Sequence, residues 1–192
     1  MRTPIALLLL FCLGLPAANA TVAGECDGLS FPQQIQAGGQ TLTLNGLGLR
    51  TATIFSIKVY VGALYVPRPT ADANAILTSR EPAEMELRFV FHVTAGQLRS
   101  AWTEGFEKSA PGQLPQLQSR IDQLNGWMHG VGSGQRMTFL RIPGVGIRYS
   151  LDGAVQGTIP GDDFAQAFLA IWLGASPPSQ AMRAGLLGGA CS

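Results

Sequence analysis

Residues 45–66 read NGLGLRTATIFSIKVYVGALYV and decide the fold. They hold one arginine, Arg50, after two closely spaced glycines and ahead of a long alternating pattern. Successive side chains of a strand point to opposite faces, so the alternation separates an apolar set from a mixed set. The apolar set is Phe55, Ile57, Val59, Val61 and Ala63, and the mixed set is Ser56, Lys58, Tyr60 and Gly62. The pattern predicts a strand over residues 50–66, with one face in a core and the other bordering a ligand.

Other alternating segments predict an antiparallel sheet. Residues 40–45 have a short strand pattern, and residues 84–93 alternate apolar with polar side chains, which is typical of a half-buried strand with one solvated face. Residues 135–158 contain three short segments separated by Pro143-Gly144 and Asp152-Gly153. Such turn residues favour an antiparallel meander.

Helical periodicity accounts for much of the remaining chain. Thr94, with Gln97 three positions later, has the pattern of a capping box, and apolar residues at helical spacing follow it. Further helices are predicted over residues 72–79, 114–127, 160–174 and 177–187. Strands and helices in this order predict an α+β fold in which helices gather against one antiparallel sheet.

Residues 1–20 have the pattern of a secretory signal peptide. Arg2 precedes an apolar run over residues 5–15, and Ala18-Asn19-Ala20 forms a small-residue cleavage site. The run is too short to span a bilayer of roughly 30 Å as a helix, and no later segment reaches about 18 apolar residues. A retained anchor helix is the less favoured alternative. We expect a periplasmic or secreted protein in which residues 21–192 form a single domain without stable membrane insertion.

Charge and motifs exclude several classes of function. Without Arg2 the chain has 12 basic and 12 acidic residues, and only 13% of all residues are charged. A surface without a basic cluster argues against nucleic acid as a partner. His92 and His129 lack ligand neighbours at metal spacing, and nucleotide-binding and serine-nucleophile motifs are missing. We expect no metal, no cofactor, and a small apolar or amphiphilic ligand.

Two cysteines remain after removal of a signal peptide that carries Cys12. They are Cys26 and Cys191, near opposite ends of the mature chain. An oxidising compartment permits a disulfide between them. The sequence leaves open whether the pair is bonded or forms two separate thiols.

Several strings in a fixed order resemble the chalcone isomerase family, particularly its bacterial chalcone isomerase-like branch. The likeness spans residues 44–187. Its pieces are Gly46-Leu47-Gly48-Leu49-Arg50 followed by KVYVGALYV, then Thr103-Glu104-Gly105, LDGAVQGTIP, IWLG and SPPSQAMRAGLLG. The resemblance implies an open-faced β-sandwich: a large antiparallel sheet that carries a layer of helices, with an apolar cleft between them.

The same resemblance implies two different functions. In the plant isomerases, an arginine at the place of Arg50 stabilises the negative oxygen of the substrate during ring closure, an intramolecular lyase reaction. Four other polar positions of those enzymes are replaced here, by Tyr60, Leu98, Gly105 and Ile171. Because one preorganised donor to an oxyanion is worth roughly 3 to 4 kcal/mol, we expect little isomerase activity. Arg50 is the one catalytic candidate if the protein is an enzyme.

In the fatty-acid-binding relatives, an arginine and a tyrosine hold the ligand carboxylate, and Arg50 and Tyr60 match that pair. The apolar replacements make the cleft more suitable for an acyl chain. We therefore expect a non-catalytic protein that binds a fatty acid or a similar carboxylate, with Arg50 as the anion anchor. The expected ligand-binding residues are Arg50, Tyr60, Leu98, Trp102, Gly105 and Ile171. The alternative to both functions is a structural or partner-binding protein in which Arg50 pairs with Glu104.

Overall fold

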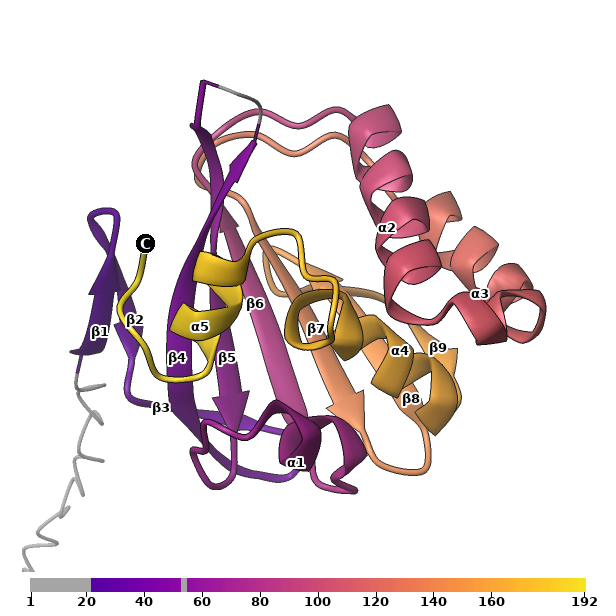
Figure 1. The fold of residues 1–192 in the computed structure, drawn as a ribbon, viewed down its shortest axis with the longest axis horizontal. Coiled ribbons are helices and arrows are strands. Elements are labelled where there is room, and N and C mark those ends of the chain that lie inside the picture. Colours follow the sequence, from indigo (N-terminus) through magenta and orange to yellow (C-terminus); the bar gives the residue numbers. More distant parts are fainter. Residues whose placement is uncertain (1–21, 53–54) are drawn as a thin grey trace, which may run out of the picture.

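The computed structural model describes residues 22–52 and 55–192, so the predicted signal peptide lies outside the described residues. Seven antiparallel strands form one curled sheet in which each strand pairs with its neighbours in the chain (Figure 1). The strands are β3 (Gln34–Ala37), β4 (Gln40–Ala52), β5 (Ile57–Val66), β6 (Ala83–Phe89), β7 (Arg136–Ile142), β8 (Gly146–Leu151) and β9 (Ala154–Pro160). The last three confirm the predicted meander.

Helices gather against this sheet, with α4 packed on β8, α3 on β9 and α5 on β4. The helices are α1 (Ala73–Thr78), α2 (Ala95–Ser109), the short 3-10 helix η1 (Pro111–Gln113), α3 (Leu114–Gly126), α4 (Asp162–Leu173) and α5 (Gln180–Leu186). The larger core lies between the sheet and these helices, and it holds the contacting rings of Trp102, Phe168 and Trp172. This arrangement confirms the predicted α+β, open-faced β-sandwich.

The predicted capping box begins α2. The Thr94 hydroxyl accepts a hydrogen bond from the Gln97 backbone N–H at 3.2 Å, and the Gln97 side-chain oxygen accepts one from the Thr94 N–H at 2.9 Å. These two bonds satisfy backbone donors that the first helical turn leaves unpaired. They fix the start of α2.

Residues 50–66 form a hairpin, not the single strand that the alternation predicts. β4 continues through Arg50 to Ala52, and β5 begins only at Ile57. Ser56 has a φ of 50°, in the left-handed region used by tight turns. Arg50 therefore lies on a different strand from Tyr60, and the two residues are opposite each other in the ladder.

A bulge also changes the predicted faces of β5. Tyr60 pairs with Arg50, but Lys58 pairs with Thr51, so Val59 has no opposite residue. The extra residue resets the alternation, because a one-residue shift moves side chains to the other face. Val59 consequently lines a cavity together with Tyr60, whereas Val61 lies in the core on the opposite side of the sheet.

The opposite side of the sheet is covered by a short hairpin of β1 (Val22–Cys26) and β2 (Leu29–Pro32), which the sequence did not predict (Figure 1). Beneath it, the Arg88 guanidinium lies 4.2 Å from the centre of the Phe31 ring and bonds the carboxylate of Glu86. Glu86 is only 3% exposed. The prediction of a solvated polar face is therefore wrong for Glu86 and Arg88, which the hairpin covers, whereas His92 lies beyond the end of β6 and is exposed.

A disulfide joins Cys26 of β1 to Cys191 near the C-terminus, with the Cα atoms 5.9 Å apart. This spacing lies within the usual range for a disulfide. The bond connects the covering hairpin to the segment that follows α5. Two distant parts of the chain are thus held together on the same edge of the sheet.

The glycines ahead of Arg50 allow α5 to lie directly on β4. A β-carbon on Gly46 would come within 2.1 Å of the Gly185 carbonyl oxygen, and one on Gly48 within 2.5 Å of the Met182 carbonyl oxygen. Real β-carbons do not approach backbone atoms so closely, so only glycine fits at these two positions. Gly46 and Gly48 are therefore required for the packing of α5 on β4, in addition to preceding Arg50 in the sequence.

Among the described helices, none is both long enough and apolar enough to cross a bilayer.

Candidate functional site

A cavity of about 400 Å³ lies between the sheet and α2, near the ends of β4, β5 and β6. The loop after α4 closes one side with Pro177 and Pro178. Its volume is within the range of small-molecule sites, about 300 to 1,000 Å³. All six residues that the sequence predicts for the ligand line this cavity: Arg50, Tyr60, Leu98, Trp102, Gly105 and Ile171.

Arg50 reaches the cavity from β4 and is half-buried. Its guanidinium donates a hydrogen bond to the backbone oxygen of Thr51. None of the ion pairs found within residues 22–52 and 55–192 includes Arg50. A guanidinium carries five N–H donors and a permanent charge, so within the described residues Arg50 has a charge that no carboxylate neutralises.

Glu104 does not form the ion pair with Arg50 that one reading of the sequence proposed. Its carboxylate bonds the ammonium of Lys108, one helical turn further along α2. This bond is the main reason why the pKa of Glu104 is lowered, and the charge of Arg50 adds a smaller contribution in the same direction. The charge of Arg50 thus influences Glu104, but the ion pair of Glu104 is with Lys108.

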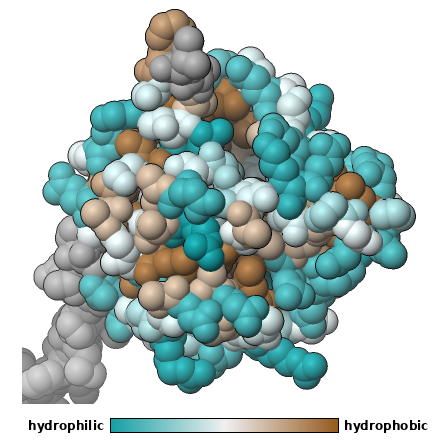
Figure 2. Space-filling model, in the orientation of Figure 1, coloured by the Kyte–Doolittle hydropathy of each residue, from teal (hydrophilic) through white to brown (hydrophobic). Residues whose placement is uncertain are grey.

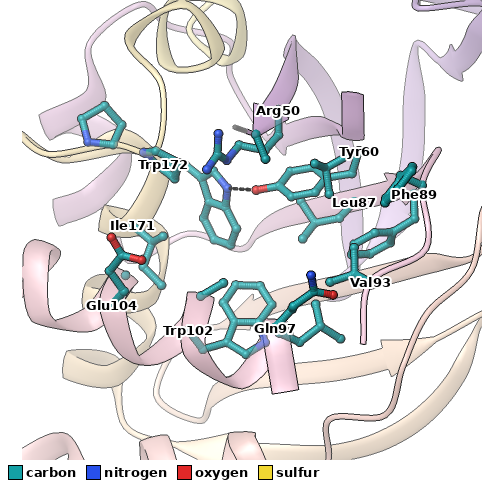
Figure 3. A pocket seen from close by; sticks show the side chains of 18 of the residues that line it. Arg50, Tyr60, Leu87, Phe89, Val93, Gln97, Trp102, Glu104, Ile171 and Trp172 are labelled. Carbon is teal, nitrogen blue, oxygen red and sulfur yellow. Dashed lines mark hydrogen bonds between the residues drawn. The ribbon is translucent and has the colours of Figure 1, made fainter. Parts of the chain in front are cut away.

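Tyr60 contributes a hydroxyl whose partner fixes its role. The indole Nε1–H of Trp172 donates to the Tyr60 hydroxyl oxygen at 3.0 Å, as the dashed line in Figure 3 shows. An indole N–H can only donate, so the Tyr60 oxygen is the acceptor and its own hydrogen must be directed elsewhere. Burial raises the pKa of Tyr60, while the indole bond and Arg50 lower it by less. Tyr60 therefore stays protonated at neutral pH and serves as a donor.

The remaining walls of the cavity are mainly apolar. Leu87 and Phe89 line it from β6, and Leu98 and Trp102 line it from α2. Trp102 lies below Tyr60 and Trp172 in Figure 3. The aromatic ring of Tyr60 itself lies 5.5 Å from that of Phe89. The cavity thus combines two adjacent donors with an extended apolar surface.

Gly105 leaves room for Ile171 where α2 approaches α4. A β-carbon at Gly105 would lie 3.0 to 3.2 Å from three side-chain atoms of Ile171. The two residues therefore shape the wall as a pair. A larger residue at position 105 would push Ile171 toward the cavity.

Trp172 was not among the residues predicted for the site, although it donates the hydrogen bond that the Tyr60 hydroxyl accepts. A signal was present, since Trp172 continues the apolar stripe of Phe164 and Phe168 and directly follows Ile171. That stripe predicts a core residue, and Trp172 is indeed only 1% exposed. Its polar N–H, however, is directed to Tyr60, which lies 112 positions earlier.

The fold and the cavity define a class that the comparison with known proteins also identifies. The profile of the chalcone isomerase-like family matches residues 23–188, so the chain belongs to this family. Among solved structures, a fatty-acid binding protein of Arabidopsis thaliana, AtFAP1, matches 89% of this chain and 100% of its own, with a TM-score of 0.66 and 14% sequence identity. No curated protein sequence matches the chain.

These comparisons confirm the family that the sequence resembles and the fold that it predicts. At 14% identity, the likeness to AtFAP1 establishes a shared fold and does not assign a ligand. The chemistry of the cavity has to be argued from the residues that line it.

Proposed function

We propose that the cavity binds a fatty acid or a similar small amphiphilic carboxylate, without chemical conversion. The observation that carries the proposal is the juxtaposition of Arg50 and Tyr60, two donors on one apolar cavity. The ligand carboxylate would accept hydrogen bonds from both side chains, and the acyl chain would lie along Leu87, Phe89, Leu98 and Trp102.

Electrostatics favours an anion at this place. Among the described residues, the partly buried guanidinium of Arg50 has a hydrogen bond to the Thr51 oxygen but no carboxylate partner, and a buried charge without a counter-charge is unfavourable. A ligand carboxylate supplies the counter-charge, and a charge-assisted bond to arginine is about twice as strong as a neutral one. The Tyr60 hydroxyl adds a donor beside Arg50, since its oxygen is already occupied by Trp172. One carboxylate can satisfy both groups.

The apolar walls supply the second part of the recognition. Each methylene group that moves from water into an apolar site contributes about 0.8 kcal/mol. The charged end alone would not distinguish a fatty acid from acetate, whereas the walls favour a longer chain. That AtFAP1 is a fatty-acid binding protein with the same fold supports this choice of ligand.

Native mass spectrometry tests the proposal directly. We expect protein purified without detergent to carry added mass that organic extraction removes and that a fatty acid restores. The control is the corresponding fatty alcohol, which has the same chain without the carboxylate and is expected to bind more weakly. If the protein retains no lipid and the extracted protein has no affinity for fatty acids, the proposal is wrong.

The isomerase alternative has one observation in its favour, the position of Arg50 on the cavity wall. A chalcone cyclisation assay separates the two functions. We expect the wild-type rate to equal the uncatalysed rate and to be unchanged in Arg50→Ala. A clear rate that Arg50→Ala abolishes would instead identify an enzyme.

We further propose that the protein is exported, as residues 1–20 indicate. The disulfide between Cys26 and Cys191 supports this, because such bonds persist in oxidising compartments. The experiment is fractionation of the producing cell, followed by intact mass measurement. A mature chain that begins at Thr21 and lies outside the cytoplasm is expected; an uncleaved cytoplasmic chain would contradict it.

A further inference from the structure

Three exposed apolar side chains lie in two segments that border the cavity, residues 55–57 and the loop after β6. Phe55 is 79% exposed, Phe91 is 49% exposed and Ile57 is 36% exposed. Ile57 and Phe91 also line the cavity, and Phe55 lies two positions before Ile57 at the tip of the β4–β5 hairpin. We name these three residues the apolar rim. In Figure 2, apolar surface is visible on the described part of the hairpin where it projects at the top of the molecule.

Scattered exposed apolar residues are ordinary, but a group of them around one opening is not. The described chain has five large exposed apolar side chains, and the other two, Val145 and Val155, do not line the cavity. Two of the three rim residues therefore lie on the wall of the proposed ligand site, and the third is two positions away in the chain. Two backbone hydrogen bonds connect the segment that carries Phe91 to β5. The N–H groups of Val90 and Phe91 both donate to the Val59 oxygen, at 2.9 and 3.3 Å.

Charged groups stand beside the rim. Lys58 and Lys108 have about half of their side chains exposed, 54% and 55%, and they pair with Asp27 and Glu104. Together with Arg50, these groups are three basic and two acidic side chains. Aromatic side chains beside lysines are typical of surfaces that contact the interface of a bilayer.

We propose that the apolar rim docks on a lipid bilayer, so that the ligand passes between the bilayer and the cavity without crossing water. This inference rests on the proposed function. An acyl chain gains about 0.8 kcal/mol for each methylene that enters a bilayer, so the supply of such a ligand is concentrated in membranes. A cavity that is bordered by the apolar rim can take up its ligand directly from the membrane. The rim side chains insert among the headgroups, and the cavity then faces the acyl layer.

Vesicle flotation tests the docking. The same purified chain is used for every variant, so that any contribution of residues 1–21 is common to all samples. We expect wild type to float with phosphatidylcholine vesicles and Phe55→Ser to bind at least about tenfold more weakly, because an exposed aromatic ring no longer enters the bilayer. Val155→Ser is the matched control, since Val155 is 61% exposed and apolar but lies on β9, away from the cavity lining.

A second variant tests directly whether the side chain at position 55 enters the bilayer. Phe55→Trp is expected to keep vesicle binding, and its added fluorescence should be quenched by brominated lipid more strongly than the emission of the wild-type tryptophans. Equal quenching of both proteins would contradict insertion of the rim. A dimer that dissociates in Phe55→Ser, with no vesicle binding by wild type, would show that the rim contacts a second copy instead.

Two binding assays separate failure of the docking from failure of the proposed function. Phe55 does not line the cavity, so Phe55→Ser should bind a fatty acid delivered from water as wild type does, but should acquire it from vesicles at least about tenfold more slowly. Equal transfer rates would overturn the docking and leave the ligand site intact. Rim-dependent vesicle binding without any fatty-acid affinity would overturn the proposed function alone.

Discussion

The indole Nε1 of Trp172 donates a hydrogen bond to the hydroxyl oxygen of Tyr60 at 3.0 Å, across 112 positions of the chain. The bond connects α4 with β5 and therefore the helical layer with the sheet. Because the Tyr60 oxygen accepts from Trp172, its O–H is not directed at the indole nitrogen and can donate to another group. A residue on another element thus limits the orientation of this donor.

Trp172→Phe should weaken fatty-acid binding while preserving most of the ring contacts with Trp102 and Phe168. A net hydrogen bond is worth about 0.5 to 1.5 kcal/mol, so the affinity should fall about three- to tenfold. Isothermal titration calorimetry with one fatty acid measures the change. If Trp172→Phe binds as tightly as wild type while Tyr60→Phe binds more weakly, Tyr60 does not depend on Trp172 for its orientation.

The disulfide between Cys26 and Cys191 should stabilise the folded chain by about 2 to 5 kcal/mol, because it closes a loop across nearly the whole chain. Urea unfolding with and without a reducing agent measures this difference. The double variant Cys26→Ser with Cys191→Ser should be as stable as reduced wild type. Its unfolding midpoint should not change when reductant is added. An identical unfolding midpoint for oxidised and reduced wild type would contradict the prediction.

Glu84 predicts a pH dependence of stability. Burial, and to a lesser extent the nearby charge of Glu86, raises the pKa of Glu84 to about 7. Since the folded protein holds this proton more tightly than the unfolded chain, the free energy of unfolding should fall as the pH rises from the ordinary pKa of a glutamate toward 7. Above that range the contribution is constant.

Glu84→Gln removes this titration. The variant should gain stability relative to wild type at pH 8 and should gain less at pH 5, where Glu84 of the folded protein is already protonated. Urea unfolding at the two pH values gives the comparison. A difference between variant and wild type that is the same at both values would show that Glu84 does not titrate in this window.

Gly48→Ala should separate α5 from β4. Its added β-carbon would meet the Met182 carbonyl oxygen at 2.5 Å, and overpacking of this kind costs about 1 to 3 kcal/mol. The control is Gly126→Ala, because a β-carbon at Gly126 on α3 meets no atom within 4 Å. Thermal unfolding of both variants should show a lowered midpoint for Gly48→Ala alone. Equal midpoints would mean that α5 adjusts without loss.

Most of the fold could be predicted because its signals are local. Alternation predicted β6 and the meander, and Thr94 with Gln97 predicted the start of α2. The turn between β4 and β5 was not predicted, because residues 53–56, TIFS, contain no glycine, proline, asparagine or aspartate, which usually mark a turn. The hairpin of β1 and β2 escaped because its strands are short and lack clear alternation.

The candidate site, too, has residues that the sequence could predict and residues that it could not. The resemblance to the family identified Arg50, Tyr60, Leu98, Gly105 and Ile171, which all line one cavity, because the positions of a family motif are preserved when the order of elements is preserved. Trp172 could not be assigned to the site, because its role depends on a contact between β5 and α4. The bulge at Val59, which turns that residue into the cavity, depends likewise on pairing with β4.

The affinity of wild type and Arg50→Met for a fatty acid and for its methyl ester tests the central claim most directly. The ester keeps the chain but has no negative charge, and Arg148→Met serves as a control on the exposed surface of β8. A hydrogen bond to a charged group is worth about 1.5 to 3 kcal/mol, so Arg50→Met should weaken acid binding about ten- to hundredfold and leave ester binding nearly unchanged. Equal acid affinity in Arg50→Met and wild type would contradict the role of Arg50 as the anion anchor.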